Sequence, residues 1–377
     1  MNSSTHKWIL WASIVFLVVA IAVGVAGDIS QAGPYLIAFF STLAFGVRGY
    51  PPVKGLSFTI SILAVVTTAL YYPFLFDEIN GFELAVLITP LIQIIMFGMG
   101  SSMGIKDFIE LSKRPKSVLV GVAAQFTIMP FIGFALASFS QFPAEISAGL
   151  ILLGTAPTSV TASLFCYLAK ANVALAITIT AVTTLLAPFL LPLLMKLFAG
   201  GFIEIDVLGM MWGMIQIVIL PIGAGLLFNH FLSGKAQWLD NAMPLVSMVG
   251  VAVIVAIIIA AGRDSLLNIG FLLLFMVTVH NILGYVLGYW VGRLFNLEER
   301  DYRAIAISTG MQNAGLASGI AKVMGKIATV GLAPAVCGPI MGFTSSILAS
   351  YWNNSTEENT ELKQGTELAQ NEKKQKA

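Results

Sequence analysis

Charged residues are scarce in this sequence. Asp, Glu, Lys and Arg make up only 10% of its 377 residues, whereas hydrophobic residues make up 57%. Soluble proteins carry about 25% charged residues, which cover the surface that faces water. A chain with so few charges cannot form such a surface, so most of its surface must face lipid. The mean hydropathy of +0.88 agrees with this interpretation.

Other shortages exclude further classes of protein. The net charge is only +1, which argues against a nucleic-acid partner. The only two cysteines, Cys166 and Cys337, lie in apolar stretches, so a disulfide framework is not expected. The sequence lacks the His-Glu-x-x-His motif, and no Asp or Glu lies deep in an apolar segment. We therefore predict no catalytic residues and no metal cofactor.

Twelve stretches have the apolar character of membrane helices. A helix needs about 20 mostly apolar residues to cross the hydrocarbon core. The stretches cover residues 8–27, 34–48, 57–75, 82–104, 117–139, 145–168, 172–198, 207–231, 244–261, 269–294, 303–325 and 329–351. The sequence thus predicts an all-α polytopic membrane protein.

The two ends of the chain are predicted to lie outside a ten-helix body. Residues 1–56 form an N-terminal extension with one or two extra membrane helices. The segment 25–27 resembles a signal-peptide cleavage region, so removal of the first helix is an open alternative. Residues 352–377 are polar and of mixed charge, which predicts a disordered cytoplasmic tail.

The basic residues predict an orientation in the membrane. If the connections between segments alternate in side, sixteen of the twenty Lys and Arg residues fall on the side of the N-terminus. Basic residues concentrate in cytoplasmic loops. Both termini are therefore predicted to be cytoplasmic, in a plasma (inner) membrane protein.

Two segments contain polar, helix-breaking patches near the middle of the membrane. Residues 154–163 read GTAPTSVTAS, and residues 308–315 read STGMQNAG. Pro157 removes a backbone donor, and Gly310 and Gly315 lower the cost of unwinding. Unwound backbone persists at this depth only where protein buries it or where it lines a wet cavity. Ordinary helix packing through small residues is the alternative.

Each patch lies in the fourth segment of a five-segment block. The first block covers residues 57–198 and the second covers 207–351. Because five is odd, the second block inserts upside down relative to the first. Inverted-repeat transporters have this arrangement, with two crossed discontinuous helices at the substrate site. Half-helix N-termini at such a crossing attract anions.

Several amide or imidazole side chains lie within apolar segments, among them Gln125, His280, Asn281, Gln312 and Asn313. Such groups are costly inside a membrane unless they have partners, so they mark candidate sites. Gln125 fits either a cation ligand or a helix–helix hydrogen bond. His280 fits either a substrate contact or a packing role. Since no Lys or Arg lies deep, helix N-termini, amides and hydroxyls would hold an anionic substrate.

Four stretches resemble the bile acid:sodium symporter family, and as an ordered set they are specific. They are IMFGMG at 95–100, QFTIMP at 125–130, YLAKANVAL at 167–175 and GMQNAGLA at 310–317, with HNILGY at 280–285 as a weaker fifth. The resemblance spans about 57–351, all ten helices of that fold. It implies a panel domain, a core domain with two crossed broken helices, and sodium-coupled uptake of an amphipathic or small organic acid.

The resemblance also implies site residues. The second sodium site would include Gln125, Ser308, Thr309, Met311 and Gln312. The first sodium site would include Ser163 and Thr180. The candidate substrate contacts are Thr161 and Asn313, together with the intramembrane pair His280 and Asn281.

The chain departs from the family pattern at the sodium sites. Ser308 stands where the family has an acidic residue that would compensate both sodium ions. Ala162-Ser163 replaces Ser-Asn in the first break, and Ala176 replaces a hydroxyl residue. We expect the first site to be lost and the second to be weak.

The predicted function is secondary transport of a small organic anion, either a carboxylate or a bile-acid-like molecule, by alternating access. No cofactor is expected apart from Na⁺ as a coupling ion. The expected partners are the substrate and the lipid bilayer, with no nucleic acid and no obligate protein partner. A channel or a non-transporting sensor on the same fold is the main alternative, and an intramembrane enzyme is a weaker one.

Overall fold

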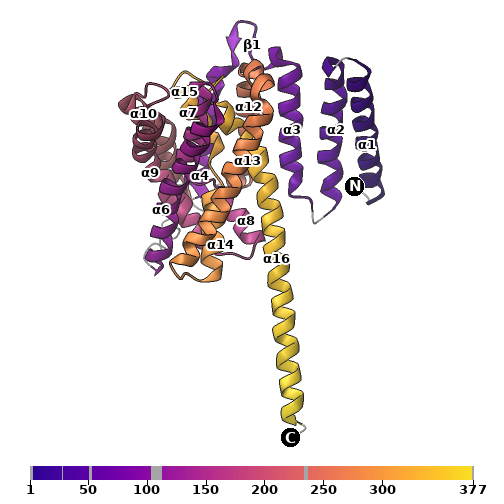
Figure 1. Ribbon diagram of the computed structural model, residues 1–377, viewed down its shortest axis with the longest axis vertical. Helices are drawn as coiled ribbons and strands as arrows, with labels where there is room; N and C mark the ends of the chain where they lie inside the picture. Colours follow the sequence, from indigo (N-terminus) through magenta and orange to yellow (C-terminus); the bar gives the residue numbers. More distant parts are fainter. Residues whose placement is uncertain (1–2, 28, 51–52, 103–112, 233–236, 376–377) are drawn as a thin grey trace.

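The computed structural model describes residues 3–27, 29–50, 53–102, 113–232 and 237–375. Lys106, Lys235 and Lys376, which contribute to the predicted charge asymmetry, lie outside these residues. The helices, labelled as in Figure 1, are α1 (Ser3–Ala26), α2 (Gly33–Gly46), α3 (Leu56–Tyr71), α4 (Ile88–Ser102), α6 (Pro115–Ser140), α7 (Ala144–Thr155), α8 (Ala162–Leu168), α9 (Val173–Ala199), α10 (Val207–Met214), α11 (Leu220–Leu232), α12 (Gln237–Ala261), α13 (Arg263–Leu294), α14 (Glu299–Gly310), α15 (Ala314–Val323) and α16 (Leu332–Gln375).

The remaining regular elements are short. Five π-helical residues, Ile215–Ile219, join α10 to α11. A two-stranded hairpin, β1 (Glu78–Ile79) and β2 (Phe82–Glu83), lies between α3 and α4, and its residues are exposed. Single 3₁₀ turns cover Ile29–Ala32, Val47–Gly49, Pro73–Leu75 and Leu84–Leu87.

All twelve predicted segments contain helix. In the described part of the chain, eight helices are long and apolar enough to cross a membrane. The other four segments contain α2, α3 and the half-helices of the two interrupted segments. The all-α polytopic membrane fold predicted from hydropathy is therefore confirmed.

The helices form two groups. In the panel, α4 packs against α11 and α12, and α12 packs against α3. In the core, α13 packs against α6, α14 and α16, and α6 packs against α7 and α9. The two groups meet where α10 contacts α9, α3 contacts α16, and α15 contacts α4 and α12. This division into panel and core agrees with the fold expected from the resemblance.

The packing of the first five segments is repeated by the second five. In the first block α6 packs on α7 and α8 packs on α9; in the second, α13 packs on α14 and α15 packs on α16. Across the blocks, the contact of α3 with α12 corresponds to that of α11 with α4. These paired contacts are the packing expected of two inverted five-helix repeats.

The N-terminal extension is a helical hairpin beside the panel. Helix α1 packs on α2, and α2 packs on α3, so the three run side by side in Figure 1. The Ser57 hydroxyl donates to the Ala44 carbonyl at 2.9 Å, and the Tyr71 hydroxyl donates to the Ile29 carbonyl at 3.0 Å. The extension thus contains two helices, where the sequence predicts one or two.

The end of the chain differs from its prediction. Where the sequence predicts a disordered tail over 352–377, helix α16 continues to Gln375 and projects beyond the other helices (Figure 1). The segment is rich in Glu, Lys and Gln, which are strong helix formers. Its polarity removes it from the core, but its helix propensity favours continuation of the helix.

Candidate functional site

The two predicted breaks are present and meet in the core. Residues 156–161 separate α7 from α8, and residues 311–313 separate α14 from α15. Thr158 and Gln312 pair as an isolated antiparallel β-bridge. We refer to these two non-helical segments, 156–161 and 311–313, as the crossing.

Main-chain hydrogen bonds join the two halves of the crossing. The Ser159 amide donates to the Met311 carbonyl at 2.8 Å, and the Asn313 amide donates to the Pro157 carbonyl at 2.8 Å. Each break thus satisfies backbone groups that the other has released from its helix. Since unpaired backbone groups cost several kcal/mol inside a membrane, neither break is stable in this form without the other.

Two buried glutamines reinforce the crossing from different repeats. The Gln125 side-chain amide, on α6, donates to the Ala156 carbonyl and to Gln312 Oε1, both at 2.7 Å. The Gln312 amide donates in turn to the Thr309 carbonyl at 2.6 Å. Both glutamine side chains are fully buried. Gln125 and Gln312, which the sequence placed in one sodium site, are therefore in direct contact.

Asn281 supports the second break from α13. Its amide donates to the Gly310 carbonyl at 2.9 Å, and its carbonyl accepts a hydrogen bond from the Thr344 hydroxyl at 2.6 Å. His280, its neighbour, places Nε2 3.3 Å from the Met129 carbonyl. Both side chains are fully buried. The sequence analysis placed them among the substrate contacts, but this geometry gives them a supporting position.

Asn313 lies where α15 begins. Its side-chain oxygen accepts a hydrogen bond from the Leu316 amide at 3.0 Å and so caps the helix N-terminus. Thr161, in the first break, is exposed, and its hydroxyl lies 2.9 Å from the Ser159 hydroxyl. These two predicted substrate contacts thus retain some access, in contrast to His280 and Asn281.

The oxygens of the predicted second sodium site are largely engaged. The Thr309 and Met311 carbonyls accept hydrogen bonds from within the crossing. The buried hydroxyls of Ser308, Thr309 and Thr184 have no hydrogen-bond partner among the described residues. The donor set offers neutral oxygens to a cation, and Ser308 contributes no negative charge.

The predicted residues of the first sodium site have separate partners. The Thr180 hydroxyl donates to the Ser159 carbonyl at 3.5 Å, whereas the Ser163 hydroxyl donates to the Val160 carbonyl at 3.0 Å. Among the described residues, no group of three or more His, Cys, Asp or Glu could hold a metal ion.

The three predicted helix-break residues have different roles. Pro157 lies in the first break and accepts the Asn313 hydrogen bond. Gly310 ends α14 against the Tyr285 ring, where an added Cβ would lie only 2.2 Å from a ring carbon. Gly315 belongs to the first turn of α15 and has no atom nearer than 3.7 Å to such a Cβ. Close packing explains Gly310, whereas Gly315 does not contribute to the break.

Two residues that contribute to this region were not identified from the sequence. The Thr158 amide lies 3.3 Å from the Thr183 hydroxyl that accepts its hydrogen bond, and Thr344 donates to Asn281. Thr158 lies directly after Pro157, and this position was the only available signal for it. Thr344 lies in an apolar helix, where a threonine usually bonds to its own helix backbone.

Comparisons with known proteins agree with this fold. The model of the Sodium Bile acid symporter family matches residues 89–269. An uncharacterized sodium-dependent transporter, YocS of Bacillus subtilis (strain 168), is 35% identical over 308 residues, which are 81% of this chain and 94% of the relative. The probable chloroplastic sodium/metabolite cotransporter BASS1 of Oryza sativa subsp. japonica is 29% identical, with 80% and 73% coverage.

The family model covers parts of both repeats and includes the first break, 156–161. The relatives are described as transporters, and the present structure has the polytopic helical architecture that membrane transport requires. The chain belongs to the sodium bile acid symporter family of secondary transporters and is not an enzyme.

Proposed function

We propose that this protein carries a small organic anion across the plasma membrane by alternating access, and that sodium coupling is weak or absent. The observation that supports the proposal most strongly is the crossing, where two interrupted helices bond to each other through main-chain groups. The transporter folds that share this arrangement bind their substrates at such crossings.

An anion suits the polarity of the crossing. The N-terminus of α15 directs its partial positive charge toward the crossing. Asn313 and Thr161 add hydrogen-bonding groups with residual exposure. A carboxylate binds well to such neutral donors, so a deep Lys or Arg is not required.

Weak sodium coupling follows from the ligand groups. Ser308 supplies a hydroxyl where the family pattern has a carboxylate, and the Thr309 and Met311 carbonyls already accept hydrogen bonds. A sodium ion there would share these carbonyls with their hydrogen-bond donors and would gain no opposite charge from Ser308. The first sodium site provides fewer ligands for an ion, because Ser163 and Thr180 donate hydrogen bonds to different carbonyls.

A thermal-shift screen of small carboxylates, with and without sodium, tests substrate class and coupling together. A ligand that binds only the folded state raises the unfolding temperature. At a concentration of 100 times its Kd, it increases the free energy of unfolding by about 2.7 kcal/mol. We expect at least one carboxylate to stabilise the protein equally in sodium and in potassium salts. If stabilisation required sodium with a steep two-ion dependence, the weak-coupling part of the proposal would be wrong.

A further inference from the structure

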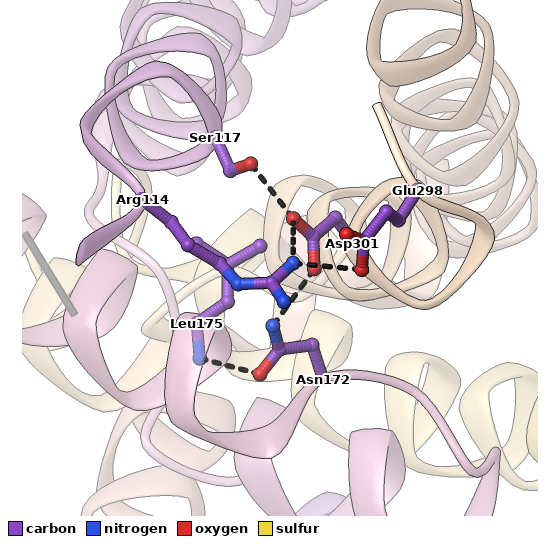
Figure 2. Close-up of polar contacts among 6 residues, drawn as sticks. All are labelled: Arg114, Ser117, Asn172, Leu175, Glu298 and Asp301. Carbon is purple, nitrogen blue, oxygen red and sulfur yellow. Dashed lines mark hydrogen bonds and ion pairs between the residues drawn. The ribbon is translucent and has the colours of Figure 1, made fainter. Parts of the chain in front are cut away.

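A buried carboxylate organises one end of the core (Figure 2). Asp301 lies in the first turn of α14, and its side chain is only 3% exposed. It accepts hydrogen bonds from Ser117 at 2.7 Å and from Asn172 at 2.7 Å, and it forms an ion pair with Arg114 at 3.0 Å. We call these four residues the lower clamp, after their position in Figure 1. Glu298, which is exposed, shares the Arg114 guanidinium.

The lower clamp joins three helix N-termini. The side-chain oxygen of Asn172 caps α9 by accepting a hydrogen bond from the Leu175 amide at 3.1 Å. The backbone amide of Asn172 donates to the Arg300 carbonyl at 3.0 Å. Hydrogen bonds to Glu298 and then to Asp301 raise the pKa of the Arg114 guanidinium above its ordinary value. The Arg114 guanidinium therefore keeps its positive charge at any physiological pH.

A second carboxylate occupies the corresponding place at the other end of the core. Glu145 lies in the first turn of α7. It forms an ion pair with Lys326 and accepts a hydrogen bond from the Thr329 hydroxyl at 2.6 Å. We call these three residues the upper clamp. Lys326 and Thr329 belong to the connection between α15 and α16.

The two clamps are related by the inverted repeat. Each acid lies at the start of the first half-helix of one repeat, α7 or α14. Each is held by the connection that follows the second half-helix of the other repeat, after α15 or after α8. Asn172 in the lower clamp thus corresponds to Lys326 and Thr329 in the upper clamp. This correspondence was not visible in the sequence, because the partners differ in chemical type.

We infer that Glu145 and Asp301 are positioning residues that fix the outer ends of the two broken helices and thereby keep the crossing in register. Helices α7 and α14 have only 12 residues each, and each ends in unwound backbone at the crossing. Helices this short are marginal by themselves, so their ends must be tied down elsewhere. Because each clamp joins one repeat to the other, it resists sliding of α7 relative to α15 and of α14 relative to α8.

The two clamps differ in exposure to solvent, which predicts that they contribute unequally to the stability of the crossing. The side chains of the upper pair are 34% and 37% exposed, so water and salt screen their attraction. Asp301 is buried and accepts charge-assisted hydrogen bonds, and removal of its charge deprives three donors of a charged acceptor. Loss of the lower clamp should therefore disturb the crossing more than loss of the upper clamp.

Hydrogen–deuterium exchange of the full-length protein without substrate tests this inference independently of transport. The reporters are the Ser159 and Asn313 amides, which bond across the crossing. With Asp301→Asn we expect exchange at both reporters to accelerate about tenfold. Glu145→Gln should accelerate it about twofold, and only at low salt. Glu298→Gln, which removes the exposed partner of Arg114, is the matched control and should leave both amides unchanged.

A charge swap separates positioning from simple loss of packing. The variant that combines Glu145→Lys with Lys326→Glu restores the ion pair in reverse, so exchange at the crossing should return toward the wild-type rate. If Asp301→Asn does not fold, Glu145→Gln and the charge-swap variant still test whether a clamp holds the crossing in register. Exchange that rises only around residues 145 or 301, with the Ser159 and Asn313 amides unaffected, would overturn the inference.

Discussion

At the residue scale, the crossing depends on side-chain amides that act through backbone carbonyls. Gln125 holds the Ala156 carbonyl at the end of α7, and Asn281 holds the Gly310 carbonyl at the end of α14. Each amide comes from the long helix of the same repeat, α6 or α13. The two carbonyls would otherwise lack partners in a low-dielectric environment, which costs about 1–3 kcal/mol each.

The two glycines of the second break provide a matched pair of substitutions. Gly310→Ala should destabilise the protein by about 1–3 kcal/mol, because the new methyl group overlaps the Tyr285 ring. Gly315→Ala has ordinary van der Waals space and lies in a helix, so it should be neutral or stabilising by up to about 1 kcal/mol. Thermal unfolding in detergent measures both. Equal destabilisation by the two would contradict the assigned packing role of Gly310.

Ser308 is the position at which sodium coupling should be recoverable. We expect Ser308→Glu to increase the sodium dependence of ligand binding, because it places a negative charge where the family pattern has one. Ser308→Gln, which is similar in size but neutral, is the control and should not do so. The measurement is ligand-induced thermal stabilisation in sodium against potassium. The same sodium response in both variants would mean that charge at this position does not govern coupling.

Sequence reasoning identified some of these residues better than others. Gln125 and Gln312 were predictable because an amide deep in a membrane requires a partner, and the structure shows that each is the other's partner. The roles of His280 and Asn281 were not predictable, because a polar residue in an apolar helix does not reveal which way it faces. Asp301 was overlooked because the start of α14 has the composition of an exposed turn, although tertiary packing buries it.

At the element scale, the breaks were predictable in place but not in extent. Pro157 and Gly310 mark them, yet Ser163 and Ser308, which were inside the predicted patches, are helical. The non-helical segments extend only over the residues around two hydrogen bonds, Ser159 to Met311 and Asn313 to Pro157. Those bonds join residues that are about 150 positions apart in the sequence, which local patterns cannot specify.

The N-terminal hairpin should be dispensable for the fold and for ligand binding. Its packing on the body is through α3, and it contributes no residue to the crossing. We expect a variant that lacks residues 1–50 to insert in the same orientation, because an even number of helices is removed. Ligand-induced thermal stabilisation of the purified variant should match that of the full chain. Loss of ligand binding by a folded variant would show that the hairpin contributes to the site.

At the scale of the whole molecule, the charge asymmetry predicts which ends face the cytoplasm. Asn80, in the β1–β2 turn, and Arg300, near the lower clamp, are both exposed and lie at opposite ends of the helices. In intact cells, Asn80→Cys should react with a membrane-impermeant thiol reagent, whereas Arg300→Cys should react only after permeabilisation. Native Cys166 and Cys337 are buried and should give little background. The reverse labelling pattern would contradict the predicted orientation.

The division into panel and core places the crossing wholly within the core. Helices α7, α8, α14 and α15 provide the crossing, while α4 and α12 approach it from the panel through α15. Alternating access then requires movement at the panel–core boundary, whereas the crossing keeps its internal hydrogen bonds. A carrier that works in this way saturates and supports exchange of labelled for unlabelled substrate, which a channel does not.

Counterflow of a labelled carboxylate in proteoliposomes tests the central claim, that the crossing is the substrate site. Gln312→Ala should abolish counterflow, because it removes the partner of both Gln125 and the Thr309 carbonyl. Gln216→Ala removes the same type of side chain from an exposed position in the panel and should exchange substrate at the wild-type rate. Saturable counterflow that Gln312→Ala leaves intact would contradict the account.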